Sequence, residues 1–142
     1  MSYGTVLLKG YARWLDANGF GTYREDGVFA PAERGIVVSA MPEAPTEVLS
    51  VTRYLPEYFR TYSGSRYLAA TRVQLRFRLA AGNPLAGEDL FDRLFEAQDR
   101  QRLELGALSA HVHYLSFAPL GMDKNGRWAW TTNWQFTGIQ AV

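Results

Sequence analysis

The sequence predicts an α+β fold in which two helices pack on one face of a five-stranded, mainly antiparallel or mixed sheet. Two helical patterns and five strand-like segments follow one another in the order α-β-β-β-α-β-β. Two helices are too few to cover both faces of a five-stranded sheet, so we expect both on the same face. The 142 residues, 47% of them hydrophobic and 20% charged, suit a single domain spanning 1–142.

The first helix is predicted over 7–18, where apolar and aromatic residues recur at helical spacing. It should end at Gly19, because glycine accepts the left-handed conformation that follows many helices. Breakers make 20–35 mostly a loop, within which a short edge strand can start at Tyr23. The β-branched, apolar segment 35–41 is typical of a buried strand.

Two further strands are predicted at 47–55 and 67–80. The first alternates imperfectly between apolar and polar residues, whereas the second gives the cleanest alternation in the chain. One face of this second strand is apolar, and its other face carries polar residues that include Arg72, Arg76 and Arg78. The intervening stretch 56–66, rich in Tyr and Arg, is predicted to be a long loop.

The last third of the chain predicts a helix and then a hairpin. Apolar positions at helical spacing indicate a helix over 88–103. Strands at 109–119 and 126–139 should be antiparallel neighbours joined through 119–126. The final strand places three tryptophans on one face, which we expect to be buried under the helices: Trp128, Trp130 and Trp134.

The composition excludes several classes of protein. The formal net charge of +1 gives no electrostatic footprint of a general nucleic-acid binder. The absence of Cys rules out disulfides and thiolate metal sites. The first residues lack a basic leader, and no apolar run approaches the roughly 20 residues of a membrane helix. We therefore expect a soluble protein without a signal peptide.

Side chains that could carry chemistry are few. His111 and His113 point to the same side of a strand and could ligate zinc, or could simply belong to a polar sheet face or a subunit contact. The segment "YSGSR" (62–66) lacks the G-x-S-x-G pattern of a nucleophile elbow. We expect no catalytic residue, no metal and no cofactor, and a protein that is not an enzyme.

Contact residues are predicted instead in two loops and on one strand face. The candidates are Tyr58, Phe59, Arg60 and Tyr62 in the first loop, Met122, Asp123 and Lys124 in the second, and Arg72, Arg76 and Arg78 on the strand. Tyr, Phe and Arg are enriched at protein interfaces because they bury much area. Two alternatives stay open: Tyr58 and Phe59 could cover a sheet edge within the same subunit, and the arginines could form a solvated face.

Four stretches together resemble the phage tail-terminator proteins, a family also described as bacteriophage minor capsid proteins. They are "YARWLDANGFGTYREDGVFAPAERGIVVSAMPEAP", "TRVQLRFR", "PLAGEDLFDRLFEAQ" and "SFAPLGMDKNGRWAWTTNWQF". They occur in the order typical of the family and span nearly the whole chain. The middle stretch "YLPEYFRTYSGSRYL" departs from the family by being aromatic and basic.

The resemblance implies structural work in a virion. It implies a small α/β sheet with helices on one side, and a ring, commonly a hexamer, at the head-proximal end of the tail. Such a ring stops polymerisation of the tail tube and joins the tail to the head connector, with phage DNA passing through without sequence-specific binding. The protein would be made in the host cytoplasm. A neck or head-completion protein, and a nucleic-acid-binding module using Arg72, Arg76 and Arg78, are the alternatives.

Overall fold

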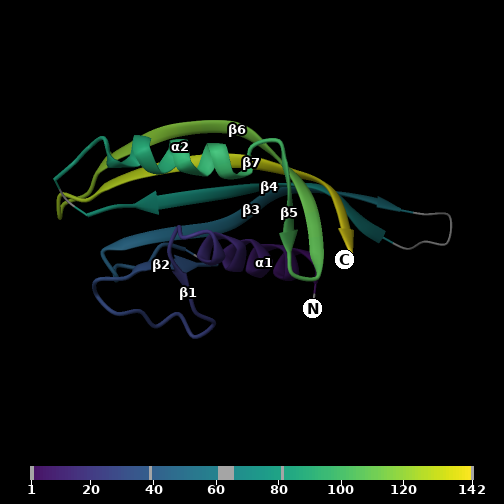
Figure 1. Ribbon diagram of the computed structural model, residues 1–142, viewed down its shortest axis with the longest axis horizontal. Coiled ribbons are helices and arrows are strands. Elements are labelled where there is room, and N and C mark those ends of the chain that lie inside the picture. The colour runs from purple at the N-terminus through teal and green to yellow at the C-terminus, as the bar shows by residue number, and fades with distance from the viewer. Residues whose placement is uncertain (1, 39, 61–65, 81, 142) are drawn as a thin grey trace.

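The computed structural model describes residues 2–38, 40–60, 66–80 and 82–141, with the backbone alone described at 59–60 and 66–68. Within these residues the chain forms two helices and seven strands (Figure 1). In chain order they are α1 (Tyr3–Ala17), β1 (Thr22–Tyr23), β2 (Arg34–Val37), β3 (Glu47–Arg60), β4 (Arg66–Arg78), α2 (Ala86–Gln98), β5 (Gln101–Leu105), β6 (Leu108–Met122) and β7 (Trp128–Ala141).

All seven strands belong to one sheet, in the order β1-β2-β3-β4-β7-β6-β5. The three strands at one edge, β1, β2 and β3, are parallel to one another. Every other neighbouring pair is antiparallel. The sheet is therefore mixed, and its centre is built from four long strands that run side by side along the molecule (Figure 1).

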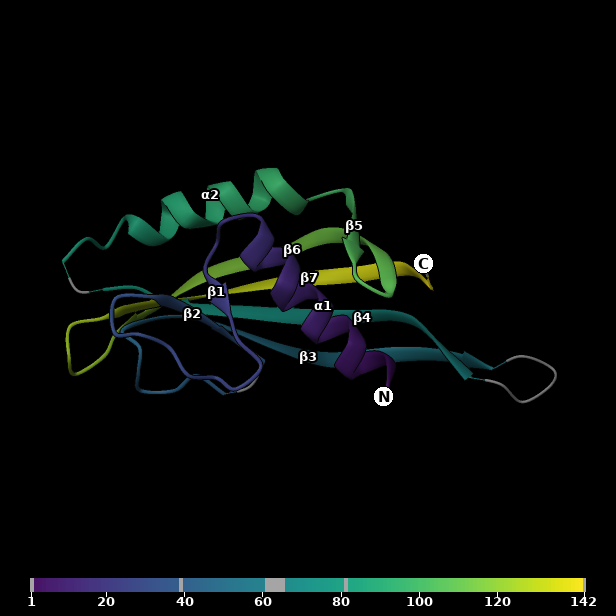
Figure 2. The ribbon, with the colours of Figure 1, turned by 60° about the horizontal axis from the view of Figure 1, so that its bottom comes forward.

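The sheet curls around α1. This helix contacts β1 at one edge of the sheet and β5 at the opposite edge, which a flat sheet of seven strands would not allow. The strands form a half-barrel with α1 in its hollow side and α2 along the rim formed by β5, β6 and β7 (Figure 2). Tyr11 of α1 packs edge-on against Phe136 at 5.1 Å, and Phe91 of α2 packs against Trp134 at 6.3 Å.

One apolar core fills the space between the helices and this inner face. Leu7, Tyr11 and Leu15 recur every four residues along α1 and are fully buried. The Tyr11 hydroxyl donates to Oε1 of Gln98 at 2.9 Å and so ties α1 to α2. Burial raises the pKa of Tyr11 far above its usual range.

The tryptophan prediction is confirmed for two of the three residues. Trp130 and Trp134 are buried, whereas Trp128 near the start of β7 is half-buried and packs against the edge of the core. Thr131 and Asn133, which alternate with them, lie on the opposite face, as the period of two requires.

The predicted five-stranded α+β fold is wrong: the sheet has seven strands and the chain is mostly β. β1 has only two residues, too few for a periodic pattern. β5 was assigned to the end of the second helix, which actually stops at Gln98. The chain reverses there because Arg100 adopts a positive φ of 57°, with its N–H donating to the Val112 carbonyl at 2.7 Å. A non-glycine residue in this conformation gives no sequence signal.

The two predicted loops are also largely strand. Residues 56–60 continue β3, and 119–122 continue β6 through Pro119. Proline is tolerated at that point because β5 pairs with β6 only as far as Val112, so the outer edge of β6 has no strand partner beyond it. The remaining part of the first loop, 61–65, lies outside the described residues, and so does Tyr62.

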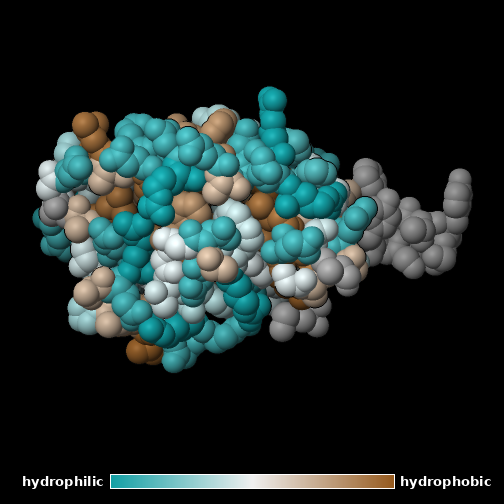
Figure 3. Space-filling view, viewed as in Figure 1, coloured by the Kyte–Doolittle hydropathy of each residue, from teal (hydrophilic) through white to brown (hydrophobic). Residues whose placement is uncertain are grey.

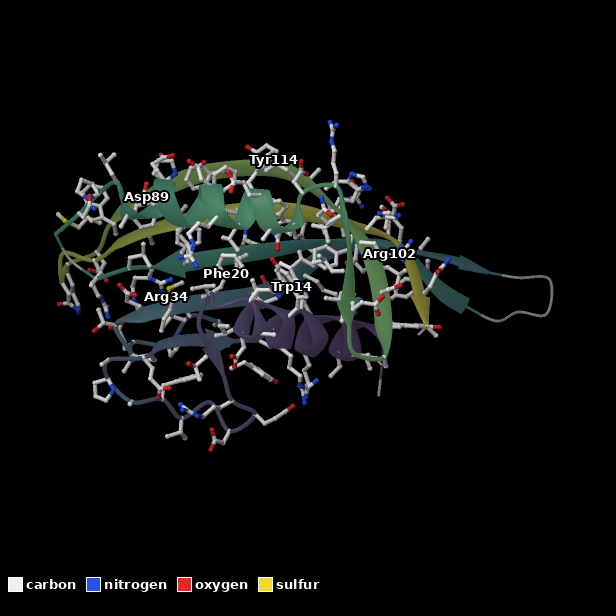
Figure 4. The ribbon with its side chains drawn as sticks, viewed as in Figure 1. Trp14, Phe20, Arg34, Asp89, Arg102 and Tyr114 are labelled. Atoms are coloured by element: carbon white, nitrogen blue, oxygen red, sulfur yellow. The ribbon has the colours of Figure 1, made fainter. Side chains whose placement is uncertain are left out.

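The loop between α1 and β2 is held by local contacts. Phe20 folds back on Trp14 of α1 with the rings 6.2 Å apart (Figure 4). Arg24 donates to both carboxylate oxygens of Glu33, at 2.6 and 2.8 Å, and the Ala30 N–H donates to the same carboxylate at 2.7 Å. These donors, the guanidinium foremost, lower the pKa of Glu33 to about 2.

We expect this carboxylate to make the protein sensitive to acid. Because the pKa of Glu33 is lower in the folded state, its contribution is present above the unfolded value of about 4.3 and is lost as pH falls from there towards 2. Glu33→Gln should therefore lose less stability over that window than the parent protein. Urea unfolding at pH 7, 4 and 2.5 measures this. Glu104→Gln, at an exposed position on β5, is the control, and an unchanged pH profile in Glu33→Gln would contradict the assignment.

Candidate assembly surfaces

The outer face of the sheet is broad and polar. Both helices pack on the inner face, and the described residues place no helix over the outer one. Three rows cross β3, β4, β7 and β6 in register: Thr52, Gln74, Asn133 and Ser116; Tyr54, Arg72, Gln135 and His113; Ser50, Arg76, Thr131 and Ala118. Amides and hydroxyls in one row are bonded to each other, as in the 2.9 Å contact between Asn133 and Ser116.

The three arginines predicted as one stripe have three different environments. Arg72 donates to the Glu57 carboxylate and to the Leu55 carbonyl, both at 3.0 Å. Arg76 is exposed and makes no hydrogen bond or ion pair to a described residue. Arg78 is only 6% exposed. Of the three, Arg76 alone presents an unpaired guanidinium, which leaves little of a phosphate-binding stripe.

Arg78 is buried because it holds the loop before β3. Its guanidinium donates to three backbone carbonyls of that loop, those of Glu43, Pro45 and Thr46, at 3.2, 2.7 and 2.9 Å. Burial, and then the neighbouring Arg127, lower its pKa. Arg78 therefore holds the loop before β3 in place, and its guanidinium is bonded to these three carbonyls.

The rest of the predicted 119–126 loop, residues 123–126, is a tight turn held by side-chain contacts. Both oxygens of the Asp123 carboxylate accept from Arg127: its N–H and its Nε lie 2.9 and 2.8 Å away. These bonds, the backbone one first, lower the pKa of Asp123. Asp123 thus organises the turn, whereas Met122 and Lys124 on either side of it are exposed.

Beside this turn the outer face is hollowed. We call this feature the basic hollow; it has a volume of about 440 Å³. Its lining combines three arginines with apolar side chains and the turn: Ala40, Met41, Arg76, Arg78, Leu120, Gly121, Met122, Asp123, Arg127 and Ala129. Arg127 bridges it to the loop before β3 through the carbonyl and the carboxylate of Glu43, at 2.9 and 3.1 Å.

Three members of this surface were not predicted from the sequence: Arg127, Met41 and Leu120. Arg127 and Glu43 are far apart in the chain and meet only because the sheet brings the start of β7 next to the loop before β3. The one local signal is the Asp-x-x-Gly-Arg pattern of 123–127. This pattern indicates a turn, but it does not indicate that the turn lines a hollow.

The other predicted contact region is an arm at the opposite end. Residues 57–60 of β3 pair with 66–70 of β4, while β7 accompanies β4 only as far as Ala70. This two-stranded β3–β4 arm extends beyond the rest of the sheet (Figure 1 and Figure 2). Tyr58 is half-buried at its base, and its hydroxyl accepts from Arg53 at 3.0 Å. Phe59 and Arg60 follow in the arm.

The histidine pair lies on the polar face. His111 and His113 are exposed on β6 with ring centres 6.5 Å apart. Across the described ranges, no group of three or more His, Cys, Asp or Glu residues could hold a metal ion. Nor, in those ranges, is any helix long and apolar enough to cross a membrane.

A curled sheet with a polar outer face, a hollow beside a fixed turn and a projecting arm defines a protein that offers surfaces for assembly. A family model described as "Bacteriophage tail terminator protein" matches residues 14–138. No curated protein shows significant sequence similarity to the chain. Because the match covers most of the sequence, the chain belongs to the bacteriophage tail terminator family.

Membership makes the protein a structural component of the phage tail. A tail protein is part of the virion and contacts other components of the tail or head. The family is structural and not enzymatic. The surfaces available for such contacts are the outer face, the basic hollow and the β3–β4 arm.

Proposed function

We propose that this protein caps the tail tube as a ring, stops the polymerisation of the tube and forms the interface through which the tail joins the head. The ring consists of copies of this chain, with a hexamer as the expected order. It contacts the tail tube protein on one side and connector or neck proteins on the other. Phage DNA passes through it without sequence-specific binding, and the chain is made in the host cytoplasm before assembly.

The observation that carries the proposal is the extent of the family match. It reaches from the last turn of α1 into β7 and so includes all or part of every helix and strand. The fold adds physical support, because its outer face and its arm offer polar and extended surfaces typical of non-obligate contacts. Capping a tube requires contact surfaces in the right positions and no chemical reaction.

We assign the β3–β4 arm to a contact with a neighbouring copy or with the tube. Phe59 and Arg60 are of residue types that are enriched at interfaces between proteins. The arm extends beyond the rest of the sheet (Figure 1), because β7 accompanies β4 only as far as Ala70. At the other end of the molecule, Met122 and Lys124 flank the turn that Asp123 fixes, and they complete the proposed contact set with Arg76.

The experiment uses a phage whose own copy of this gene is disabled. Without the protein, we expect tails of abnormal length that carry no heads, and the wild-type chain supplied in trans should restore normal tails joined to heads. Normal tails in its absence would refute the function. The arm is tested with Phe59→Ser/Arg60→Ser, which leaves Tyr58 and its contact with Arg53 intact.

The matched control is Val28→Ser/Arg100→Asn, which removes an exposed apolar residue and an exposed arginine elsewhere. Asn is used because Arg100 lies at positive φ, which Asn tolerates. Normal melting of the arm variant with at least tenfold fewer infectious particles supports an interface. A lowered melting temperature that alone explains the defect would mean that the arm residues only cover a sheet edge.

A further inference from the structure

The solvent-exposed side of α2, which faces away from the sheet, carries a line of carboxylates. Four of them lie at helical spacing behind an exposed leucine, and we call this set the acidic stripe: Leu85, Glu88, Asp89, Asp92 and Glu96. All five residues are exposed, and none of the four carboxylates forms an ion pair with a described residue. The surface over α2 is correspondingly hydrophilic (Figure 3).

Carboxylates in the first turn of a helix are ordinary, because they complement the helix dipole. That reason applies to Glu88 and Asp89 but not to Asp92 and Glu96, which lie further along the same side. The chain as a whole is nearly neutral at +1. The carboxylates of α2 are therefore free to meet positive charge on another surface.

The basic hollow offers one such positive surface. Arg76 contributes an exposed guanidinium without an ion-pair partner in the described chain, and Arg127 and Arg78 lie behind it. The hollow is also partly apolar, since Leu120 and Met122 line it and are 48% and 59% exposed. Its chemistry suits a ligand that combines carboxylates with an aliphatic side chain, and the acidic stripe has that composition.

These two surfaces cannot meet within one molecule. Ala129 lines the hollow on the outer face of the sheet. The next residue, Trp130, points to the inner face, where Gly87 in the first turn of α2 packs directly on its ring. The start of α2 and the β6–β7 turn lie at the same end of the molecule (Figure 1 and Figure 2). The hollow and α2 are on opposite faces of the sheet there, with Asp89 on α2 (Figure 4).

We propose that the acidic stripe of one copy of this chain docks into the basic hollow of the next copy. Glu88 and Asp89 pair with Arg76, and Leu85 packs against Leu120 and Met122. The contact joins two different surfaces, so it is head-to-tail, and such contacts build closed rings when the rotation between copies closes. The inference rests on the proposed ring function and names the surfaces that make the ring.

Cysteine cross-linking tests this contact directly, because the chain has no cysteine of its own. Arg76→Cys/Asp89→Cys places one thiol in the hollow and one on the stripe of every copy, both at exposed positions. Mild oxidation should give a ladder of disulfide-linked multimers, since each copy can bond to two neighbours. The matched control, Arg76→Cys/Glu104→Cys, keeps the first thiol and moves the second to exposed β5, and it should stop at dimers or below.

The oxidation is run with concentrated protein alone and again with isolated tail tubes, so that assembly that requires a tube end is also sampled. A ladder in either condition supports the contact. No ladder in both, or an equal ladder in the control, overturns it.

Charge exchange gives an independent measurement. Arg76→Glu and Asp89→Arg should each weaken self-association by about tenfold, because like charges then face each other across the contact. Arg76→Glu/Asp89→Arg restores opposite charges and should recover most of the loss. Failure of the pair to recover would count against this contact, even where tails are still capped normally. Uncapped tails from the wild-type chain would instead refute the proposed function and leave the cross-linking result standing.

Discussion

Trp130→Ala should lower the free energy of unfolding by about 3–5 kcal/mol, as large-to-small changes do in protein cores. Trp130 is 2% exposed and stacks on Phe77 with ring centres 5.5 Å apart. On its other side, Gly87 of α2 approaches so closely that a Cβ built there would lie 2.1 Å from the ring. The indole is therefore packed against both Phe77 of β4 and Gly87 of α2, and alanine would leave a cavity there.

The close approach at Gly87 makes the prediction sharper. Gly87→Ala alone should cost about 1–3 kcal/mol, because the new methyl group overlaps the indole and helix or strand must move. In the Trp130→Ala protein the overlap disappears, and the same change should be neutral or stabilising by up to about 1 kcal/mol through helix propensity. The two substitutions are expected to be strongly non-additive.

Urea unfolding of the four proteins in this cycle measures the coupling, with Trp128→Ala as the control in the same strand. Trp128 is half-buried at the margin of the core, so its replacement should cost clearly less than that of Trp130. Equal losses at both positions, or additive effects of Gly87→Ala and Trp130→Ala, would contradict the packing described for α2.

Local alternation in the sequence was sufficient to predict the faces of the central strands. The apolar positions of β4, such as Val73, Leu75 and Phe77, are fully buried, and Trp130 and Trp134 of β7 face them. A period of two depends only on the geometry of a single strand. The buried face of such a strand can therefore be predicted without knowing which strands lie beside it.

The number of strands could not be predicted in the same way. β5 has only two apolar positions, Leu103 and Leu105, and its charged residues continue the pattern of the preceding helix. It is a strand because Arg100 reverses the chain and β6 offers its edge, and both are tertiary effects. The extension of β6 through Pro119 has the same cause, since only an edge without a partner accepts proline there.

For the candidate contact residues, too, the sequence predicted the face of the sheet but not the contacts that each side chain makes. Alternation placed Arg76 and Arg78 on one face, but two residues with the same sequence signal have opposite roles. Arg78 is buried because three carbonyls of a distant loop converge on it, and Arg76 is exposed because nothing comparable reaches it. Contacts between segments more than 30 residues apart bury one arginine and leave the other exposed to a partner.

Gly10→Ala should destabilise the protein by about 1–3 kcal/mol or more, although alanine is the better helix former by about 1 kcal/mol. A Cβ at Gly10 would lie 2.2 Å from the carbonyl oxygen of Leu105. That oxygen belongs to the backbone of β5, so it cannot move without displacing the strand. The substitution therefore acts where α1 meets the edge of the curled sheet.

Gly4→Ala is the matched control in the same helix. A Cβ there also meets atoms within 3 Å, but they form the guanidinium of Arg53, the far end of a flexible side chain. The guanidinium can swing aside, so Gly4→Ala should stay within about 1 kcal/mol of the parent protein and gain from helix propensity. Both changes add the same methyl group to α1, and only the rigidity of the neighbour differs.

Hydrogen exchange decides whether the loss in Gly10→Ala comes from opening of the half-barrel. Since α1 touches β1 and β5 at opposite edges, pushing it away from β5 should release that edge before the rest of the sheet. We expect faster exchange of amides in β5 and in the part of β6 paired with it, residues 108–112, with β3 and β4 changed little. Uniform acceleration across the sheet would mean that the curl does not depend on this contact, and Gly10→Ala as stable as Gly4→Ala would refute the close approach itself.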